Sequence, residues 1–167
     1  MIRVLVSSCL LGEKVRYHGE DALCESEILD RWRAEGRLVP ICPETSAGLP
    51  VPRPPAEIAG GDGSAVLDGK AVVAYLSGED VTAQFIRGAR LALDQAVASG
   101  ARLAVLKDGS PSCAPTYIYD GSFRGQRDSG RGVTAALLSG AGIRTFNEHQ
   151  LEEAAAYVAA LEAEAGR

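Results

Sequence analysis

The residues with the clearest capacity for chemistry are four cysteines, at positions 9, 24, 42 and 113. They form no C-x-x-C pair, so the spacing of a zinc ribbon or of a thioredoxin motif is not present. The N-terminal segment leads directly into a strand pattern without the long apolar region of a signal peptide, which predicts a cytoplasmic protein. Structural disulfides are rare in that reducing compartment, so metal binding and catalysis are the roles to weigh.

Three of these cysteines follow apolar runs that are expected to form buried strands. Cys9 ends the first run, Cys42 directly follows the second, and Cys113 stands several residues beyond the third. Because ligands of open α/β sheets bind beyond the carboxyl ends of the strands, the three thiols can converge there. Three thiolates without a fourth ligand suit a catalytic metal centre, since a structural site closes its coordination shell. Their spacing alone leaves a metal or cluster site and a set of unrelated reduced cysteines equally open.

The surroundings of Cys24 differ from those of the other cysteines. All eight prolines lie within residues 40–55 or 111–115, around Cys42 and Cys113. Each proline ring fixes φ and removes a backbone donor, which suits loops that hold soft ligands in a fixed geometry. Cys24 instead recurs with Ile28 and Trp32 at helical spacing, so we expect it to pack as a small hydrophobic side chain.

Hydrophobic periodicity predicts strands that alternate with helices. The expected strands span residues 4–6, 38–41, 65–67, 71–75, 103–106 and 143–146, and the expected helices span 21–35, 79–99, 132–139 and a last segment after 147. Asp68-Gly69 is typical of a hairpin turn, whereas 43–64 and 107–131 are expected to be irregular. This alternation predicts a single α/β domain over residues 1–167, with a mainly parallel, open, Rossmann-like sheet, helices on both faces and long cysteine-bearing loops.

Composition narrows the classes of function. The chain has 167 residues, a formal net charge of −5 and 46% hydrophobic residues, so it can bury a core and is not expected to be disordered. The acidic balance argues against a nucleic acid as the main ligand and against an anionic membrane surface, because both require clustered Lys and Arg. No apolar stretch is long enough to span a membrane. A local basic patch around a small anionic or neutral ligand remains open.

Eight short segments resemble the 2-thiouracil desulfurase family, and they run in order over most of the chain. The segments are VSSCLLG at 6–12, VRYHG at 15–19, CPE at 42–44, GLPVPR at 48–53, AEI at 56–58, LKDGSPSC at 106–113, IYDGSF at 118–123 and GRGVTA at 130–135. The ordered combination is far more specific than any one of these motifs.

The resemblance implies a [4Fe–4S] cluster that is bound by three cysteines, which map to Cys9, Cys42 and Cys113, and that leaves one iron with an open site. Cys24 lies outside this pattern. Thiolates are soft donors and suit iron–sulfur clusters, and an open iron acts as a Lewis acid toward sulfur. The implied enzyme removes sulfur from a small thiolated nucleobase such as 2-thiouracil. Water replaces the sulfur, the thiocarbonyl becomes a carbonyl, and sulfide is released without net redox change.

Hydrolytic cleavage of a C–S bond needs a group that accepts and returns a proton. Glu44, two residues after Cys42, is the candidate on proximity and on the resemblance, although it could instead cap a loop amide. Ser110 is the candidate that polarises the substrate or positions water, again on the resemblance. Ser112 could instead donate a hydrogen bond to a cluster sulfur.

Three further residues are candidates for substrate binding. Arg53 and Lys107 flank the expected site. Each either offsets the negative charge of the cluster, orients a substrate carbonyl or forms a structural salt bridge. Tyr17 is the aromatic candidate, and it shares two alternatives with Tyr119 and Phe123: each either stacks on a flat base or packs within its loop.

Three places depart from the family pattern. Thr45 follows the CPE segment where a small aliphatic residue is commoner. Position 18 is His where Asp is frequent, and His18 is either a fourth ligand or a solvated turn residue. Ala114 follows Cys113 where glycine is usual, which predicts a changed pocket shape beside the cluster.

Other functions remain open. A noncatalytic metal- or cluster-binding module that senses redox state would use the same cysteines. The G-x-G-x-x-A pattern at 130–135 is typical of dinucleotide binding, but no strand immediately precedes it. Its glycines suit a helix N-terminus that binds a phosphate or a cluster sulfur, or simply a turn.

Overall fold

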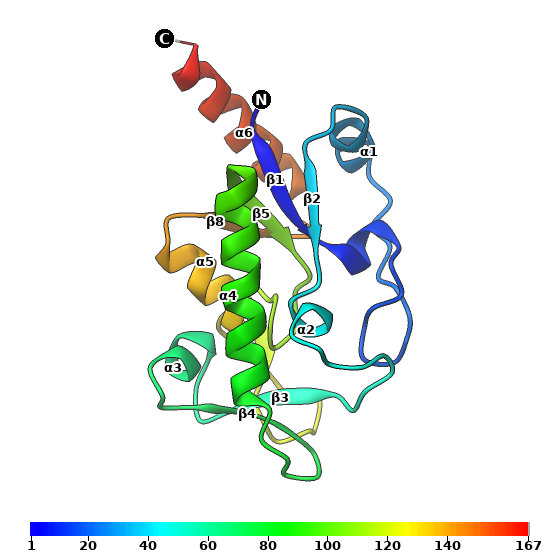
Figure 1. Cartoon of the computed structure of the whole chain (residues 1–167), viewed down its shortest axis with the longest axis vertical. Coiled ribbons are helices and arrows are strands. Elements are labelled where there is room, and N and C mark those ends of the chain that lie inside the picture. The colour runs from blue at the N-terminus through cyan, green and yellow to red at the C-terminus, as the bar shows by residue number, and fades with distance from the viewer. Residues whose placement is uncertain (167) are drawn as a thin grey trace.

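A four-stranded parallel sheet forms the centre of the molecule, of which the computed structural model describes residues 1–166 (Figure 1). The strands lie in the order β2 (Leu38–Ile41), β1 (Arg3–Ser7), β5 (Ala101–Leu106) and β8 (Arg144–Asn147). Every neighbouring pair is parallel, and Leu5 of β1 lies opposite Val39 on one side and Ala104 on the other. Buried apolar residues on both faces of β1 and β5 explain why these runs form central strands. The predicted α/β fold with a mainly parallel, open sheet is confirmed.

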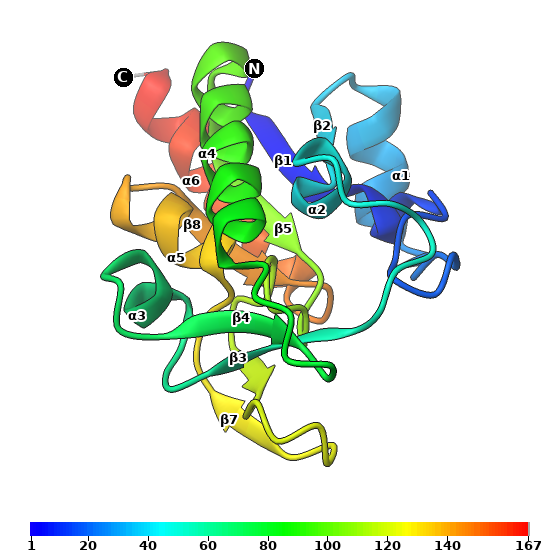
Figure 2. The ribbon, with the colours of Figure 1, turned by 60° about the horizontal axis from the view of Figure 1, so that its bottom comes forward.

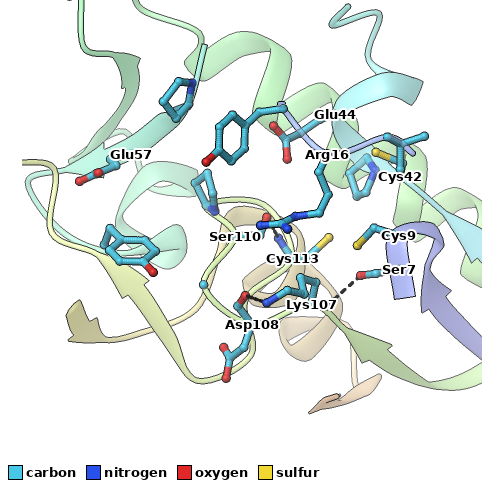
Figure 3. A pocket seen from close by; sticks show the side chains of 18 of the residues that line it. Ser7, Cys9, Arg16, Cys42, Glu44, Glu57, Lys107, Asp108, Ser110 and Cys113 are labelled. Carbon is cyan, nitrogen blue, oxygen red and sulfur yellow. Dashed lines mark hydrogen bonds between the residues drawn. The ribbon is translucent and has the colours of Figure 1, made fainter. Parts of the chain in front are cut away.

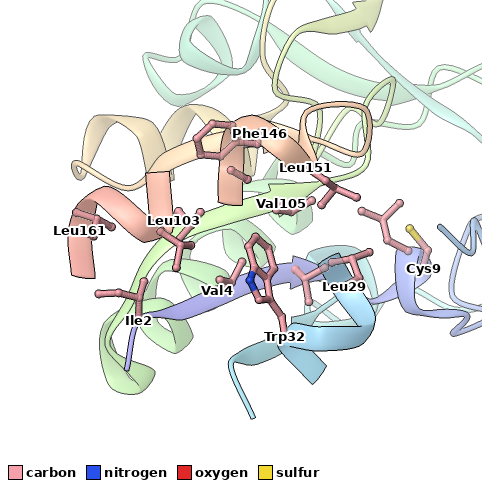
Figure 4. Packing of buried hydrophobic residues seen from close by; sticks show 14 residues of the cluster. Ile2, Val4, Cys9, Leu29, Trp32, Leu103, Val105, Phe146, Leu151 and Leu161 are labelled. Atoms are coloured by element: carbon pink, nitrogen blue, oxygen red, sulfur yellow. The ribbon is translucent and has the colours of Figure 1, made fainter. Parts of the chain in front are cut away.

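Helices cover both faces of the sheet, as predicted. On one face, α1 (Glu27–Ala34) and α6 (Leu151–Ala165) pack against side chains of β1 and β5 (Figure 4). On the other face lie α4 (Thr82–Ser99) and α5 (Val133–Gly140). Side chains alternate along β1, so Val4 and Val6 pack on the face covered by α1 and α6, whereas Leu5 packs on the face covered by α4 and α5. Within residues 1–166, none of the helices combines the length and the apolar character that crossing a bilayer would require.

The strand order reverses between β1 and β5. From β1 the chain passes to β2 on one side, and it later returns to β5 on the other side. The ends of the two strands are joined directly, because Ser7 Oγ accepts a hydrogen bond of 3.0 Å from the backbone N–H of Lys107. Ligands of open α/β sheets bind beyond the carboxyl ends of the strands at such a switch point.

Helix α1 begins later than predicted. Ser26 is its N-cap, and the Ser26 Oγ accepts hydrogen bonds from the backbone N–H groups two and three residues further on, at 3.2 and 3.4 Å. Residues 21–26 are not helical, so the predicted position of Cys24 on a helix face is wrong. Cys24 is nevertheless packed against the core cluster beneath α1, and its thiol contacts the carbonyl of Glu148 at 3.9 Å. The expected packing role of Cys24 is confirmed.

Two small antiparallel sheets lie beyond the carboxyl ends of the parallel strands (Figure 2). In one, β3 (Ala56–Ala59) pairs with β4 (Val72–Tyr75). In the other, β6 (Tyr117–Tyr119) pairs with β7 (Arg127–Ser129). Strands β3, β6 and β7 fall in the segments that were expected to be irregular, because three or four residues carry too little pattern to identify a strand.

The predicted hairpin across Asp68-Gly69 is wrong. The residues before this turn form α3 (Gly63–Leu67) rather than a strand. Asp62 caps this helix, since its Oδ1 accepts a hydrogen bond of 3.2 Å from the backbone N–H of Ala65. Local capping therefore takes precedence over the turn pattern, and β4 pairs with β3 instead.

The edge strand β2 contains a proline. Pro40 is exposed, and it lies between the buried residues Val39 and Ile41. Proline has no backbone N–H and is confined to edge strands for that reason. Its carbonyl accepts a hydrogen bond of 3.2 Å from Nε2 of Gln95 on α4.

Two glycines let helices press directly on the turns that carry Cys42 and Cys113. A Cβ atom on Gly88 of α4 would lie 2.4 Å from the carbonyl oxygen of Pro43. A Cβ atom on Gly132, the N-cap of α5, would lie 2.4 Å from the carbonyl oxygen of Ser112. No side chain fits at either position, so main-chain contact places both turns.

We expect Gly132→Ala to lower the free energy of unfolding by about 1–3 kcal/mol, because the new methyl group overlaps main-chain atoms. Chemical denaturation measures this change. Gly140→Ala is the matched control on the same helix, since no heavy atom lies within 4 Å of the added Cβ. The control is expected to be neutral or stabilising, by about 0.5 kcal/mol. Equal losses in both variants would contradict the close contact at Gly132.

The carboxylate of Asp108 connects three segments at the end of β5. Its Oδ1 accepts from the backbone N–H groups of Thr116 and Tyr117, at 3.0 and 3.1 Å. Its Oδ2 accepts from the Thr116 hydroxyl and, at 2.9 Å, from Nδ2 of Asn147 at the end of β8. Burial alone would raise the pKa of Asp108, but the hydrogen bonds from Thr116, Tyr117 and Asn147 outweigh it and hold this pKa below its ordinary value.

A lowered folded-state pKa means that Asp108 stabilises the fold fully above its unfolded pKa, about 4, and loses that contribution as the pH falls further. We expect Asp108→Asn to be about 1–3 kcal/mol less stable at pH 7 and to show a smaller loss of stability on acidification. Denaturation curves measured between neutral and acid pH test this. Asp94→Asn, on the exposed side of α4, is the control and should follow the wild-type profile. An Asp108→Asn profile parallel to that of the wild type would refute the assignment.

Candidate functional site

A cavity of about 470 Å³ opens beyond the carboxyl ends of β1, β2 and β5 (Figure 3). Residues that follow these three strands form one part of its wall. The loop around Tyr17, strand β3 and the β6–β7 hairpin form the rest. The cavity thus lies at the point where the strand order reverses, which is the expected ligand position for this sheet.

Three cysteines line the cavity, and each is carried by a different turn. Cys9 lies in the 3₁₀ turn η1 (Ser8–Leu11), Cys42 directly precedes the short helix α2 (Pro43–Ser46), and Cys113 lies in the turn after β5. Figure 3 shows the three sulfurs pointing toward the same space. The structure therefore brings these residues together, as expected from their places after strands. All four cysteines are free thiols, and Cys24 does not line the cavity.

The environment of Cys9 and Cys113 disfavours bare thiolates. Burial raises the pKa of the Cys9 thiol to about 11, with a further contribution from Cys42, while the charges of Arg16 and Lys107 oppose the shift. Burial also raises the pKa of Cys113 well above its ordinary range, against a hydrogen bond from Ser7. The neighbouring Cys42 thiol adds to both pKa shifts, and Cys9 adds to that of Cys113, because like charges disfavour ionisation. A positively charged group in this cavity would remove that penalty, since bound metals deprotonate their thiol ligands.

Ser110 shapes the turn that carries Cys113. Its Oγ accepts hydrogen bonds from the backbone N–H groups of Ser112 and Cys113, at 3.1 and 3.0 Å. Both bonds use the oxygen as acceptor, so the Ser110 hydroxyl hydrogen remains available to the cavity that this residue lines. Ser112 does not reach the cavity, because it is fully buried and its hydroxyl is 2.8 Å from that of Thr134.

The first amides of α5 support the same turn. The backbone N–H of Val133 donates to the carbonyl of Pro111 at 2.9 Å, and that of Thr134 donates to the carbonyl of Ser112 at 2.8 Å. The glycines at 130–135 therefore build a helix N-terminus, as expected. These two amides bind the cysteine turn itself, which leaves neither of them for a phosphate or a cluster sulfur.

Glu44 and Arg53 form an ion pair at the cavity wall. The Nε of Arg53 is 3.2 Å from Oε1 of Glu44, and the Arg53 side chain is only 2% exposed. The remaining nitrogens of Arg53 donate to the carbonyls of Val15 and Pro50, at 2.9 and 3.1 Å. Burial raises the pKa of Glu44 above its usual value, and the charge and hydrogen bond of Arg53 oppose this. Arg53 therefore orients Glu44 and ties two loops together.

Lys107 is likewise engaged by the protein. Its Nζ is 3.0 Å from Oε2 of Glu148, and it donates to the carbonyl of Asp108 at 2.9 Å. The other oxygen of Glu148 accepts from the backbone N–H of Asp108 at 3.0 Å. Of the alternatives open for Lys107 and Arg53, the structural salt bridge is the one seen. Glu148 had no signal in the sequence, because it lies far along the chain from Lys107 and outside every motif.

Arg16 is a site residue that sequence reasoning did not select. Its side chain extends into the space shared by the three sulfurs (Figure 3). Its charge lowers the pKa of Cys9 and of Glu44 against the upward effect of burial. The signal that could have identified it is its place in the VRYHG segment, next to Tyr17.

The aromatic residues that were expected at the site line the cavity. Tyr17, Tyr119 and Phe123 all contribute to the wall.

His18 is exposed, and its Nδ1 accepts from a backbone N–H at 3.3 Å, so it is a turn residue rather than a ligand. Ala114 does not line the cavity, because it is fully buried in a separate core cluster. The Ala114 methyl group therefore forms no part of the cavity wall.

Within the described residues 1–166, no three His, Cys, Asp or Glu side chains are arranged to hold a single metal ion. As positioned, the three cysteines consequently form no site for one ion such as zinc.

Comparison with known proteins agrees with this geometry. The profile of the family described as 2-thiouracil desulfurase matches residues 4–150. YbbK, an uncharacterised protein of Bacillus subtilis (strain 168), is 45% identical over 150 residues, which span 90% of this chain and 98% of that protein. The solved structure of the [4Fe-4S]-dependent thiouracil desulfidase TudS (DUF523Vcz) is 46% identical, with a TM-score of 0.87, and covers 95% of this chain and 99% of its own. The chain therefore belongs to the 2-thiouracil desulfurase family.

Proposed function

We propose that this protein, as one domain over its whole length, is a [4Fe–4S]-dependent desulfidase that releases sulfide from a small thiolated base such as 2-thiouracil. The observation that carries the proposal is the convergence of Cys9, Cys42 and Cys113 in one cavity beside Glu44. The 46% identity to TudS supports it, since that protein is a [4Fe-4S]-dependent thiouracil desulfidase. The four free thiols fit a reducing compartment such as the cytoplasm.

The donor set suits an iron–sulfur cluster. Cys9, Cys42 and Cys113 would hold it, because thiolates are the ligands that such clusters take. With three protein ligands the bound group supplies an iron whose free coordination position accepts a soft sulfur atom. The turns that carry Cys42 and Cys113 contain prolines and pack directly against the main chain of Gly88 and Gly132. Both features keep the sulfur donors in a fixed geometry.

Glu44 is the proton acceptor for the attacking water. Its Oε1 is held by Arg53, so Oε2 is the atom available to accept a proton. A pKa raised by burial makes this carboxylate a stronger base than one in water. Water supplies the oxygen of the new carbonyl, and its two protons leave with the sulfide, so the reaction balances without an oxidant or reductant.

Ser110, Arg16 and Tyr17 are placed to bind the rest of the substrate. The Ser110 hydroxyl has its oxygen engaged by two amides, so it donates into the cavity. Arg16 is the cation available to a carbonyl of the base, because Arg53 and Lys107 are paired with carboxylates. Tyr17 offers a ring for stacking on a flat heterocycle.

Replacing Cys9, Cys42 or Cys113 by Ser is expected to reduce the bound iron from about four atoms per chain and to abolish the broad visible absorption of a cluster. Iron and sulfide are measured on anaerobically purified protein. Cys24→Ser is the matched control and should keep both, because its thiol lies outside the cavity. A wild-type protein without iron, or a Cys24→Ser variant as poor in iron as the others, would overturn the assignment.

Glu44→Gln is expected to lower kcat for sulfide release from 2-thiouracil by about 10²–10⁴-fold, because an amide cannot accept the proton of water. Its iron content should equal that of the wild type, since Glu44 is not a ligand in this proposal. Glu79→Gln, an exposed position on the loop after β4, is the control and should keep full activity. An iron-loaded wild type that releases no sulfide from any thiolated base would favour a redox-sensing module instead.

A further inference from the structure

The loop between β6 and β7 forms the end of the cavity that lies away from the cysteines. Phe123, at the tip of this loop, lines the cavity together with Tyr119. Glu57 of β3 also lines it, and Figure 3 places Glu57 on the opposite side of the pocket from Cys9 and Cys42. None of the roles assigned above to the cysteines or to Glu44 uses these residues.

Glu57 fastens the loop to β3. Its Oε1 accepts two hydrogen bonds, one from the backbone N–H of Gly121 at 3.0 Å and one from the backbone N–H of Phe123 at 3.1 Å. The main chain at Gly121 also runs directly against β3, because a Cβ atom there would lie 2.7 Å from the carbonyl oxygen of Ile58. The loop is therefore held at two successive points by one strand.

Phe123 occupies an unfavourable backbone conformation. Its φ is 58°, and it is the one non-glycine residue among residues 1–166 with a positive φ. Residues other than glycine are strained there, and such strain persists only where the surroundings impose it. The carboxylate of Glu57 is the surrounding group that bonds to the Phe123 N–H.

We propose that Glu57 is a positioning residue that holds Phe123 as the outer wall of the cavity, and that this wall limits the size of the thiolated base. The proposal rests on the desulfidase function proposed above and adds a determinant of its substrate range. Glu57 is not placed for proton transfer at the reacting carbon, because the residue lies across the pocket from the cysteines.

Phe123→Gly tests the wall directly. Glycine removes the ring and also tolerates the positive φ, so the loop keeps its backbone conformation without strain in this variant. We expect the ratio of kcat/KM for a 2-thiouracil carrying a propyl group on its ring to kcat/KM for 2-thiouracil itself to rise about tenfold. A ratio that stays at the wild-type value in a folded, iron-loaded Phe123→Gly variant would overturn the proposal.

Variants at Glu57 separate positioning from chemistry. Glu57→Ala loses both hydrogen bonds and should shift the substrate ratio in the same direction as Phe123→Gly. The double variant should shift it no further, because both changes remove the same wall. Glu57→Gln keeps an oxygen acceptor and should retain the wild-type ratio. If Glu57→Gln instead lowers kcat for both substrates as strongly as Glu57→Ala, Glu57 acts on the chemistry and the proposal is wrong.

Limited proteolysis gives a readout that does not depend on turnover. Arg124 is exposed beside Phe123, so trypsin reports how often the loop opens. We expect cleavage after Arg124 to be about tenfold faster in Glu57→Ala than in the wild type. Asp120→Asn is the control in the same loop, because Asp120 Oδ1 accepts from the backbone N–H of Ser122, at 2.9 Å, and from the Ser122 hydroxyl rather than from the two amides that Glu57 holds. Equal cleavage of all three proteins would refute the anchor, whereas a wild type that releases no sulfide would refute only the enzyme assignment.

Discussion

The whole site depends on the direct contact between helix main chain and the turns that carry two of the cysteines. Gly88 in α4 and Gly132 at the start of α5 leave no room for a methyl group against Pro43 and Ser112. Helix α3 makes a similar main-chain contact with the start of α5, because a Cβ on Gly63 would lie 2.2 Å from the carbonyl oxygen of Gly132. Since main-chain atoms have no rotamers, this packing places Cys42 and Cys113 more firmly than side-chain contacts would.

Much of the central fold could be predicted, because it rests on patterns that are local and strong. The apolar runs at 4–6 and 103–106 form the two central strands, which are buried on both faces, so their composition alone identifies strands. Helix α3 and the late start of α1 could not be predicted with the same rules. There, single capping side chains, Asp62 and Ser26, decide between helix and loop over a few residues.

The members of the site could be predicted better than their partners. The resemblance and the positions after strands identify the three cysteines, Glu44 and Ser110, all of which line the cavity. Which cation is free for a ligand depends on tertiary pairing, as Lys107 shows by binding Glu148. The same holds for Ser112, whose hydroxyl is taken by Thr134 of α5. Pairings across such distances leave no local trace in a single sequence.

The proline in the edge strand β2 has a consequence for the association of folded chains. An exposed strand edge is a template on which another chain can add a strand. Pro40 offers no N–H to such a strand, and Gln95 already occupies its carbonyl. The sheet therefore ends at β2, whose Pro40 lies two residues before Cys42, so β-strand addition from a second molecule is disfavoured at the edge where it would distort the cysteine turn.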